Sequence, residues 1–242
     1  MTIEELAQKI TSWIKEAVSA AGGKGVAFGL SGGIDSSVIA VLCQKAFPDT
    51  CLGVIMPCHS VKTDQEHAEL LAGKFHIPAK LVVLDGVFDS LLNMLPDDGY
   101  DTATRSLSEA NLKPRLRMLT LYYFANRLNY LVIGSGNRCE LFIGYFSKYG
   151  DGGADIMPLG NLVKSQVQEL AVYLGVSREI IDKPPSAGSW SGQTDEVEMG
   201  LTYKELDQYL LTGEAGEKVR RRIESLSKRS EHKRHLPPAP PF

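Results

Sequence analysis

The chain has 242 residues, 43% of them hydrophobic and 23% charged, which is enough for one large α/β domain over residues 1–242 and too little for a second complete one. Its net charge is −3, and its four cysteines show neither a CxxC pair nor a histidine at zinc-binding spacing, which argues against a zinc protein and a disulfide framework. With no signal peptide and no apolar run near the roughly 18 residues of a membrane span, we expect a cytoplasmic protein with no membrane partner.

Helical spacing of apolar residues marks the first segment, residues 1–20. Ile3, Leu6 and Ile10 begin a pattern that predicts an amphipathic helix over residues 2–19. Its apolar face should pack either on the domain or on a partner subunit.

A strand expected at Gly25–Leu30 leads into the sequence GLSGGIDSS at residues 29–37, and a helix is expected over Ser36–Ala46. A strand, a glycine turn and a helix start in this order direct free backbone N–H groups and the positive end of a helix dipole at an anion. Gly32 and Gly33 let the backbone approach phosphate oxygens where a Cβ would intrude. The segment therefore predicts a pyrophosphate site, and an ordinary capped turn is the alternative.

Asp35 is the unusual member of this loop, because its carboxylate stands where phosphate oxygens should lie. The two negative charges would repel each other unless a divalent cation lay between them, so Mg²⁺ is implied as a cofactor. The loop carries this acid in place of the lysine of the GxxxxGK[ST] motif of kinases and GTPases.

Strands and helices continue to alternate along the chain. Strands are expected at Leu52–Pro57, Lys80–Asp85 and Tyr130–Gly134, and helices at Asp64–Phe75, Val87–Met94 and from Pro114 to Asn126. Repeated βα units predict a doubly wound, mostly parallel five-stranded sheet with helices on both faces. Ligands bind such sheets beyond the carboxyl ends of the strands, where the strand order reverses. The loops after the first and fourth strands should meet there.

The second of these loops, residues 134–155, is rich in glycine, and we expect a functional loop without helix or strand. Glu140 within it would supply the second carboxylate that a Mg²⁺ ion shared with a triphosphate uses, beside Asp35. Lys164 heads a helix expected at Lys164–Tyr173 and is the compact cation best suited to the charge of a leaving group. A solvated lysine in the first helical turn is the alternative.

Positive charge is concentrated near the end of the chain. The segment from Lys218 to His235 carries a net charge of +6, against −9 for the rest. A solvated helix and a nucleotide-binding tail over residues 230–242 are both open interpretations. Nucleic acid is not expected as a partner, because no aromatic residues are interleaved for base stacking.

The SGGIDS segment resembles the SGGxDS loop of the ATP pyrophosphatases, which cleave ATP between its α and β phosphates. Further motifs make the chain similar to the ammonia-dependent NAD synthetases within that superfamily: NLKPRLRM at 111–118, KYGDGGAD at 148–155, LVKSQ at 162–166, KPPSA at 183–187 and HKRHLP at 232–237. The resemblance implies ATP-dependent amidation of deamido-NAD to NAD through an acyl-adenylate, releasing AMP and pyrophosphate. Another ATP pyrophosphatase, of the GMP synthetase or tRNA-modifying kind, and a non-catalytic nucleotide-binding module are the alternatives.

The resemblance also assigns residues to each substrate. ATP would contact Gly29, Leu30, Ser31, Gly32, Gly33, Ile34, Asp35, Ser36, Ser135, Lys164 and Ser186, with Mg²⁺ on Asp35 and Glu140. Deamido-NAD would contact Arg115, Lys148, Asp155, His232 and Lys233. Arg117 lies two positions from Arg115 and cannot share its helix face, so we expect a structural contact for it.

For the chemistry itself, Lys164 is the expected catalytic cation and Asp151 the candidate proton acceptor. Residues 183–200 include a predicted mobile lid over Lys183–Glu196 that would exclude water from the acyl-adenylate. Ammonia is expected as the nitrogen donor, either free or delivered by a separate glutaminase, since no room remains for a glutaminase domain in this chain. The amphipathic first helix and the family resemblance favour a homodimer.

Overall fold

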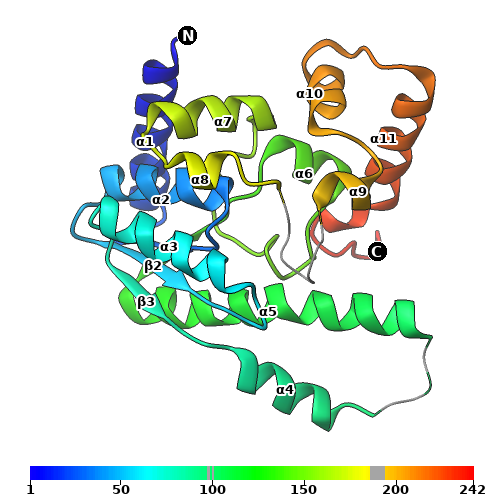
Figure 1. The fold of residues 1–242 in the computed structure, drawn as a ribbon, viewed down its shortest axis with the longest axis horizontal. Coiled ribbons are helices and arrows are strands. Elements are labelled where there is room, and N and C mark those ends of the chain that lie inside the picture. The colour runs from blue at the N-terminus through cyan, green and yellow to red at the C-terminus, as the bar shows by residue number, and fades with distance from the viewer. Residues whose placement is uncertain (97–98, 100, 186–193) are drawn as a thin grey trace.

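The computed structural model describes residues 1–96, 99, 101–185 and 194–242, and their strands form one parallel sheet (Figure 1). Its order is β3-β2-β1-β4, and the strands are β1 (Gly25–Gly29), β2 (Cys51–Ile55), β3 (Ala79–Leu81) and β4 (Tyr130–Ile133). β1 pairs with both β2 and β4, with Val26 opposite Cys51 on one side and Leu131 on the other. The strand order therefore reverses beside β1, which brings the ends of β1 and β4 together as predicted.

Helices cover both faces of this sheet (Figure 1). The helices are α1 (Ile3–Ala20), α2 (Ile34–Ala46), α3 (Lys62–Lys74), α4 (Asp85–Met94), α5 (Thr102–Leu128), α6 (Arg138–Ile143), α7 (Lys164–Tyr173), α8 (Arg178–Ile181), α9 (Asp195–Met199), α10 (Tyr203–Thr212) and α11 (Glu217–Arg229), followed by the 3-10 helix η1 (Glu231–Lys233). α1, α2, α3 and α7 share a core with one face of the sheet, and α4 and α5 share a core with the other. The helices α6, α10 and α11 enclose a third apolar cluster.

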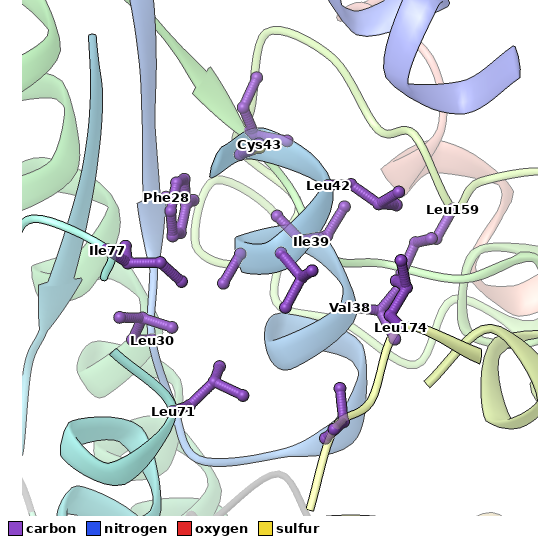
Figure 2. Packing of buried hydrophobic residues seen from close by; sticks show 14 of the residues in the cluster. Phe28, Leu30, Val38, Ile39, Leu42, Cys43, Leu71, Ile77, Leu159 and Leu174 are labelled. Carbon is purple, nitrogen blue, oxygen red and sulfur yellow. The ribbon is translucent and has the colours of Figure 1, made fainter. Parts of the chain in front are cut away.

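The central helix α2 is buried along most of its length because it lies between the sheet and a second layer of helices. Figure 2 shows Val38, Ile39 and Leu42 of α2 between Phe28 of β1 and Leu159 of the later chain. A helix that is apolar on every side is stable only in such a position. Because α2 is packed on all sides, the position of its first turn is fixed. The SGGIDSS loop includes this turn, so the positions of its side chains are fixed as well.

The apolar face of α1 packs on the domain itself. Ala7, Ile10, Ile14 and Val18 are buried in the same cluster as α2 and α7. Thr2 begins the helix by accepting a hydrogen bond from the backbone N–H of Glu5, as an N-cap residue does. The sequence predicted that this face packs either on the domain or on a partner subunit, and the structure shows that it packs on the domain.

The prediction of five strands is wrong for the described residues, which form four. A fifth strand beside β4 is reduced to a single parallel bridge between Ile133 and Ile156. The glycines before Ile156 favour turns, and Pro158 lacks the N–H that a continuing ladder needs. This edge of the sheet therefore ends in a loop that stays close to the end of β4.

Two helix predictions are also corrected. α5 begins at Thr102 rather than near Pro114, because Asp101 caps it by accepting a hydrogen bond from Thr104 N at 3.0 Å. Pro114 lies inside the helix, and Gly150 packs so closely on it that an added Cβ would lie 3.0 Å from the Pro114 ring. The loop at residues 134–155 contains α6, since the seven residues between Gly136 and Gly144 include no glycine.

Among the helices of the described residues, none is both long and apolar enough to cross a bilayer. All four cysteines are buried, and none forms a disulfide in the described chain.

Candidate functional site

A cavity of about 510 Å³ opens where β1 and β4 end. It is lined by the loop after β1, by the segments after β2 and β4, by one side of α5, and by polar side chains from other helices. Of the residues predicted to contact ATP, those lining it are Gly29, Leu30, Ser31, Gly33, Ile34, Asp35, Ser36, Ser135 and Lys164. Sequence-distant segments thus converge on one site at the predicted edge of the sheet.

The loop after β1 places its serines and the start of α2 at this cavity. Gly33 is the N-cap of α2, and it provides no side-chain hydrogen bond to the first helical turn. The Ser31 and Ser36 hydroxyl oxygens lie 2.9 Å apart, and Ser36 Oγ donates to the Gly33 carbonyl at 2.9 Å. The first-turn N–H groups of α2 thus lack the usual side-chain cap, an arrangement suited to anions.

Gly32 and Gly33 differ in backbone conformation and in the space around them, so we expect alanine substitutions at the two positions to have different effects on stability and ATP binding. Gly32 has a φ of +76°, and an added Cβ would lie 2.2 Å from the Asp64 carbonyl oxygen. We expect Gly32→Ala to cost at least about 2 kcal/mol of stability, through the left-handed conformation and this clash. A Cβ on Gly33 would meet only Ser31 Oγ, at 3.4 Å, so Gly33→Ala should fold normally but bind ATP more weakly. Denaturant unfolding and ATP titration measure the two effects, and equal stability losses would contradict this prediction.

Asp35 and Lys164 form a buried ion pair at the wall of the cavity. The Lys164 ammonium donates to Asp35 Oδ2, and the lysine side chain is 3% exposed against 17% for Asp35. Asn137 Nδ2 donates to the other oxygen of Asp35 at 3.0 Å. Lys164 is therefore not the solvated lysine of the alternative interpretation, and both oxygens of Asp35 have partners.

Glu140 lies beside this pair at the start of α6. Its Oε2 accepts a hydrogen bond from Asn137 N at 3.0 Å, in a capping box with the Asn137 side chain. Burial and the neighbouring Asp35 carboxylate raise the pKa of Glu140 to about 8. Burial alone would lower the pKa of Lys164, but Asp35 and Glu140 raise it above its usual value. The ammonium therefore stays charged beside the Asp35 carboxylate, and Glu140 releases its proton only near pH 8.

The raised pKa of Glu140 predicts that the metal-free protein loses stability as pH rises. The unfolded chain releases this proton near 4.5 and the folded protein near 8, so the folded state holds more protons between these values. The free energy of unfolding should therefore decrease across this range and level off above about pH 8. Thermal unfolding with a chelator at a series of pH values measures the slope. Glu140→Gln should flatten it, and an unchanged slope would contradict the assignment.

The donor set of this site fits a divalent cation shared with a ligand. Asp35 and Glu140 are hard oxygen ligands, and Mg²⁺ uses one or two such carboxylates together with phosphate oxygens and water. Among the described residues, no group of three or more acidic, histidine or cysteine side chains could hold a metal by itself. Phosphate and water would therefore have to complete the coordination.

A network of tyrosines and carboxylates borders the ion pair on its other side. Tyr203 Oη donates to Asp195 at 3.0 Å, and Tyr145 Oη lies 3.2 Å from Asp195 and 2.8 Å from Glu198. The Lys164 ammonium lies 4.9 Å from the centre of the Tyr203 ring. Burial raises the pKa of Asp195, although both tyrosines and Lys164 oppose the shift. Asp195 and Glu198 thus add two acidic side chains to the part of the wall that holds Lys164.

Asp151, the candidate proton acceptor, lies in the same cavity. Ser147 N donates to one of its oxygens at 2.8 Å. The carboxylate is accessible from the cavity, but burial by the surrounding walls raises its pKa above the usual aspartate value.

Arg117, which also lines the cavity, donates to the Met56 carbonyl and to Ser60 Oγ, both at 3.0 Å. The structural contact predicted for Arg117 is confirmed.

Three of the five residues predicted to contact deamido-NAD, Arg115, Lys148 and His232, are connected by hydrogen bonds and do not line the cavity. Arg115 Nε donates to the Lys148 carbonyl at 3.3 Å, and Lys148 Nζ donates to the His232 carbonyl at 2.7 Å. Lys233 lines the cavity and donates to the carbonyls of Gly144 and Phe146, both at 2.8 Å. The C-terminal tail therefore packs against the loops around α6.

Asp155 is the member of this set that the structure does not place with the others. Its side chain accepts hydrogen bonds from Tyr122 Oη at 3.0 Å and from Val132 N at 2.7 Å, between α5 and β4. Burial and Asp155 raise the pKa of Tyr122 to about 12. In this structure Asp155 supports the chain leaving β4.

Two predicted contacts with ATP remain. Gly32 lies outside the cavity lining because its backbone packs against Asp64. Ser186 lies outside the described residues, as does the part of the predicted lid between 186 and 193. At the two ends of that part, Lys183 pairs with Asp64, and Asp195 N donates to the Pro185 carbonyl at 3.1 Å. The lid stays a prediction.

Sequence reasoning missed several residues of this site. Asn137 could have been found, because Asn followed three positions later by Glu is a capping-box signature. Asp195, Tyr203 and Tyr145 carry no local signal, since they meet only when α9, α10 and the chain after α6 come together.

Comparison with known proteins finds one family. A model described as NAD synthase matches residues 6–237. The chain is 48% identical over 237 residues to an NH(3)-dependent NAD(+) synthetase of Carboxydothermus hydrogenoformans, covering 98% of this chain and 97% of that protein. Among solved structures, an NMN synthetase from Francisella tularensis matches with a TM-score of 0.93 and 38% identity over 100% of both chains. An NH3-dependent NAD synthetase from Campylobacter jejuni in complex with the nitrate ion matches with a TM-score of 0.80 and 28% identity over 99% of both.

Proposed function

The chain belongs to the NAD synthase family, as its motifs predicted, and on this basis we propose that it is an ammonia-dependent NAD synthetase. The reaction joins ammonia to the nicotinate carboxylate of deamido-NAD and converts ATP to AMP and pyrophosphate. One observation carries the proposal: Asp35, Glu140 and Lys164 meet in the cavity where the SGGIDSS loop ends. This combination suits a metal-dependent ATP-cleaving site, because two carboxylates can hold Mg²⁺ and the buried cation can stabilise charge on the leaving group.

Activation of the carboxylate must come first, because a carboxylate cannot expel oxide when ammonia attacks. An oxygen of the nicotinate carboxylate attacks the α-phosphorus of ATP, and the bond from that phosphorus to the bridging oxygen of pyrophosphate breaks. The products are an acyl-adenylate and pyrophosphate. The SGGIDSS loop orients the phosphates, and Lys164 stabilises the charge that develops on the departing pyrophosphate.

Asp35 and Glu140 would hold Mg²⁺, and when bound the ion would neutralise phosphate charge. Without it, the Lys164 ammonium provides the positive charge next to Asp35. Once a metal supplies part of the positive charge next to Asp35, the Lys164 ammonium would be able to interact with the pyrophosphate.

In the second step, ammonia attacks the acyl carbon of the adenylate, the new C–N bond forms, and AMP leaves. The nitrogen must lose a proton, and Asp151 is the proposed acceptor. Burial raises its pKa above the usual aspartate value, which makes its carboxylate a better proton acceptor, and its position in the cavity would bring it close to the reacting groups.

The test is incubation with ATP, Mg²⁺ and deamido-NAD plus either ammonium or glutamine, following NAD, AMP and pyrophosphate. NAD formation with ammonium supports the proposal, and glutamine alone should give none without a separate glutaminase. Turnover with xanthosine monophosphate instead of deamido-NAD would support a GMP synthetase-like enzyme. ATP binding without pyrophosphate release for any acceptor would support the non-catalytic module.

A second candidate acceptor is nicotinate mononucleotide, the acid that an NMN synthetase would amidate. The observation that favours it is the full-length match to the Francisella tularensis NMN synthetase, at a TM-score of 0.93. The chemistry at the carboxylate is the same, so only the rest of the acceptor distinguishes the two substrates. Comparing kcat/KM for the dinucleotide and the mononucleotide decides between them, and a mononucleotide preference of about tenfold or more would replace the first assignment.

The homodimer expected from the sequence remains a proposal, but the first helix does not support it, since its apolar face is internal. Better support comes from large apolar side chains on the opposite layer: Leu119 and Tyr123 share one face of α5, and Val87 on α4 is also exposed. Light scattering after size-exclusion chromatography measures the assembly. Leu119→Glu should yield monomers, whereas Val172→Glu on α7, also exposed, should not.

A further inference from the structure

Asp207 of α10 caps the helix that carries Lys164. The N-cap residue of α7 is Val163, whose side chain has no acceptor for the first-turn N–H groups. The Asp207 carboxylate, 43 positions after Lys164 in the sequence, acts as the acceptor instead. Its two oxygens accept hydrogen bonds from Lys164 N at 3.0 Å and from Ser165 N at 2.8 Å. A carboxylate at a helix N-terminus is also favoured by the helix dipole.

The same carboxylate is connected to the helix that carries Glu140. Cys139, the residue before Glu140, donates its thiol hydrogen to Asp207 Oδ1 at 3.0 Å. Both partners are buried, with Asp207 7% exposed and Cys139 0%. One side chain of α10 therefore holds the beginnings of α6 and α7 together.

We infer that Asp207 is a positioning residue, which fixes the Lys164 ammonium relative to Asp35 and Glu140 for the departure of pyrophosphate. This inference rests on the proposed function. Lys164 reaches Asp35 from the first residue of α7, so any shift of that turn moves its ammonium directly. Displacements of about 1 Å in an aligned site reduce rates substantially.

Asp207→Asn tests the inference with little change in volume. The asparagine amide keeps one oxygen that can accept a hydrogen bond, but its NH₂ group replaces the other oxygen. One of the two hydrogen bonds to the start of α7 is therefore replaced by a contact between two donors. We expect kcat to fall about tenfold or more, with the KM for ATP changed less than about threefold.

A matched control separates positioning from general loss of stability. Thr202 caps α10 itself by accepting from Glu205 N at 3.2 Å, and it does not touch Lys164 or Ser165. Thr202→Ala and Asp207→Asn should both lower the melting temperature, but Thr202→Ala should leave kcat nearly unchanged. If both variants lose kcat in proportion to their melting temperature, Asp207 only stabilises the fold.

A double-mutant cycle with Lys164→Met adds a sharper criterion. If Asp207 acts through the Lys164 ammonium, Asp207→Asn should cost less than about twofold in kcat once that ammonium is gone. Equal losses in both backgrounds would overturn the inference. The residual rate of Lys164→Met can be followed by pyrophosphate release at high enzyme concentration.

Hydrogen exchange gives a readout that does not depend on activity. In Asp207→Asn, the amides of Lys164 and Ser165 should exchange at least about tenfold faster, while those in the middle of α10 keep their protection. Unchanged exchange would overturn the inference whatever the turnover. If the wild-type protein releases no pyrophosphate with any acceptor, the proposed function fails, and the exchange result still decides whether Asp207 positions α7.

Discussion

Asp35→Asn is expected to reduce Mg²⁺-dependent turnover by about a thousandfold or more while the protein stays folded. Asp35 is the proposed metal ligand in the loop after β1, and it is also the ion-pair partner of Lys164. Asparagine has nearly the same shape but no charge, so the metal loses a hard anionic ligand and Lys164 loses its partner. The decisive measurement is NAD formation at a series of Mg²⁺ concentrations.

Stability should change much less than activity in this variant. Loss of a buried charge partner can cost about 3 kcal/mol, but Glu140 remains close enough to balance the ammonium. Asp64→Asn is the matched control, because Asp64 lines the same cavity and also pairs with a lysine, Lys183. We expect that control to lose less than about tenfold in turnover. An Asp35→Asn enzyme with more than a tenth of the normal rate would reject the metal assignment.

Lys164→Met should have the second-largest effect, a loss of roughly a hundred- to thousandfold in kcat with little change in the KM for the acceptor. Methionine fills a similar volume but cannot stabilise charge on the departing pyrophosphate. Without the ammonium, Asp35 and Glu140 lose the cation between them, so tighter proton or metal binding at this site should accompany the loss.

Lys183→Met is the control for this experiment, because it removes another lysine from the same cavity wall. Single-turnover measurements of pyrophosphate release test whether the slowed step is the formation of the adenylate. A Lys164→Met enzyme that forms the adenylate at the normal rate, but transfers it slowly to ammonia, would move the role of Lys164 to the second step.

Local sequence was enough to predict the strand, glycine turn and helix start around the SGGIDSS loop. The order of strand, glycine turn and helix start between Gly25 and Ala46 depends on neighbouring residues. The structure has this order, although α2 begins at Ile34, two residues before the predicted start at Ser36. Lys164–Tyr173 was predicted with its observed bounds. Alternating βα units also indicated a parallel sheet covered on both faces, and thus the edge at which the two loops meet.

Errors arose where tertiary packing overrode local preference. Pro114 signals a helix start when read alone, yet the cap at Asp101 and packing against Gly150 keep it inside α5. Glycine frequency suggested an unbroken loop after β4, although Glu140 lies in a short helix between two of those glycines. The fifth strand failed because a single bridge at Ile156 is followed by chain that cannot continue the ladder.

By itself, the sequence determined the family and singled out the SGGIDSS loop, Asp35, Glu140 and Lys164 as candidates, because these depend on residue types within short motifs. Only the tertiary structure decided what holds those groups in place. Asn137 reaches Asp35 across 102 positions, and Asp207 reaches Lys164 across 43. Such partners meet only when separate helices pack, and packing depends on the shape of the whole core rather than on any local pattern.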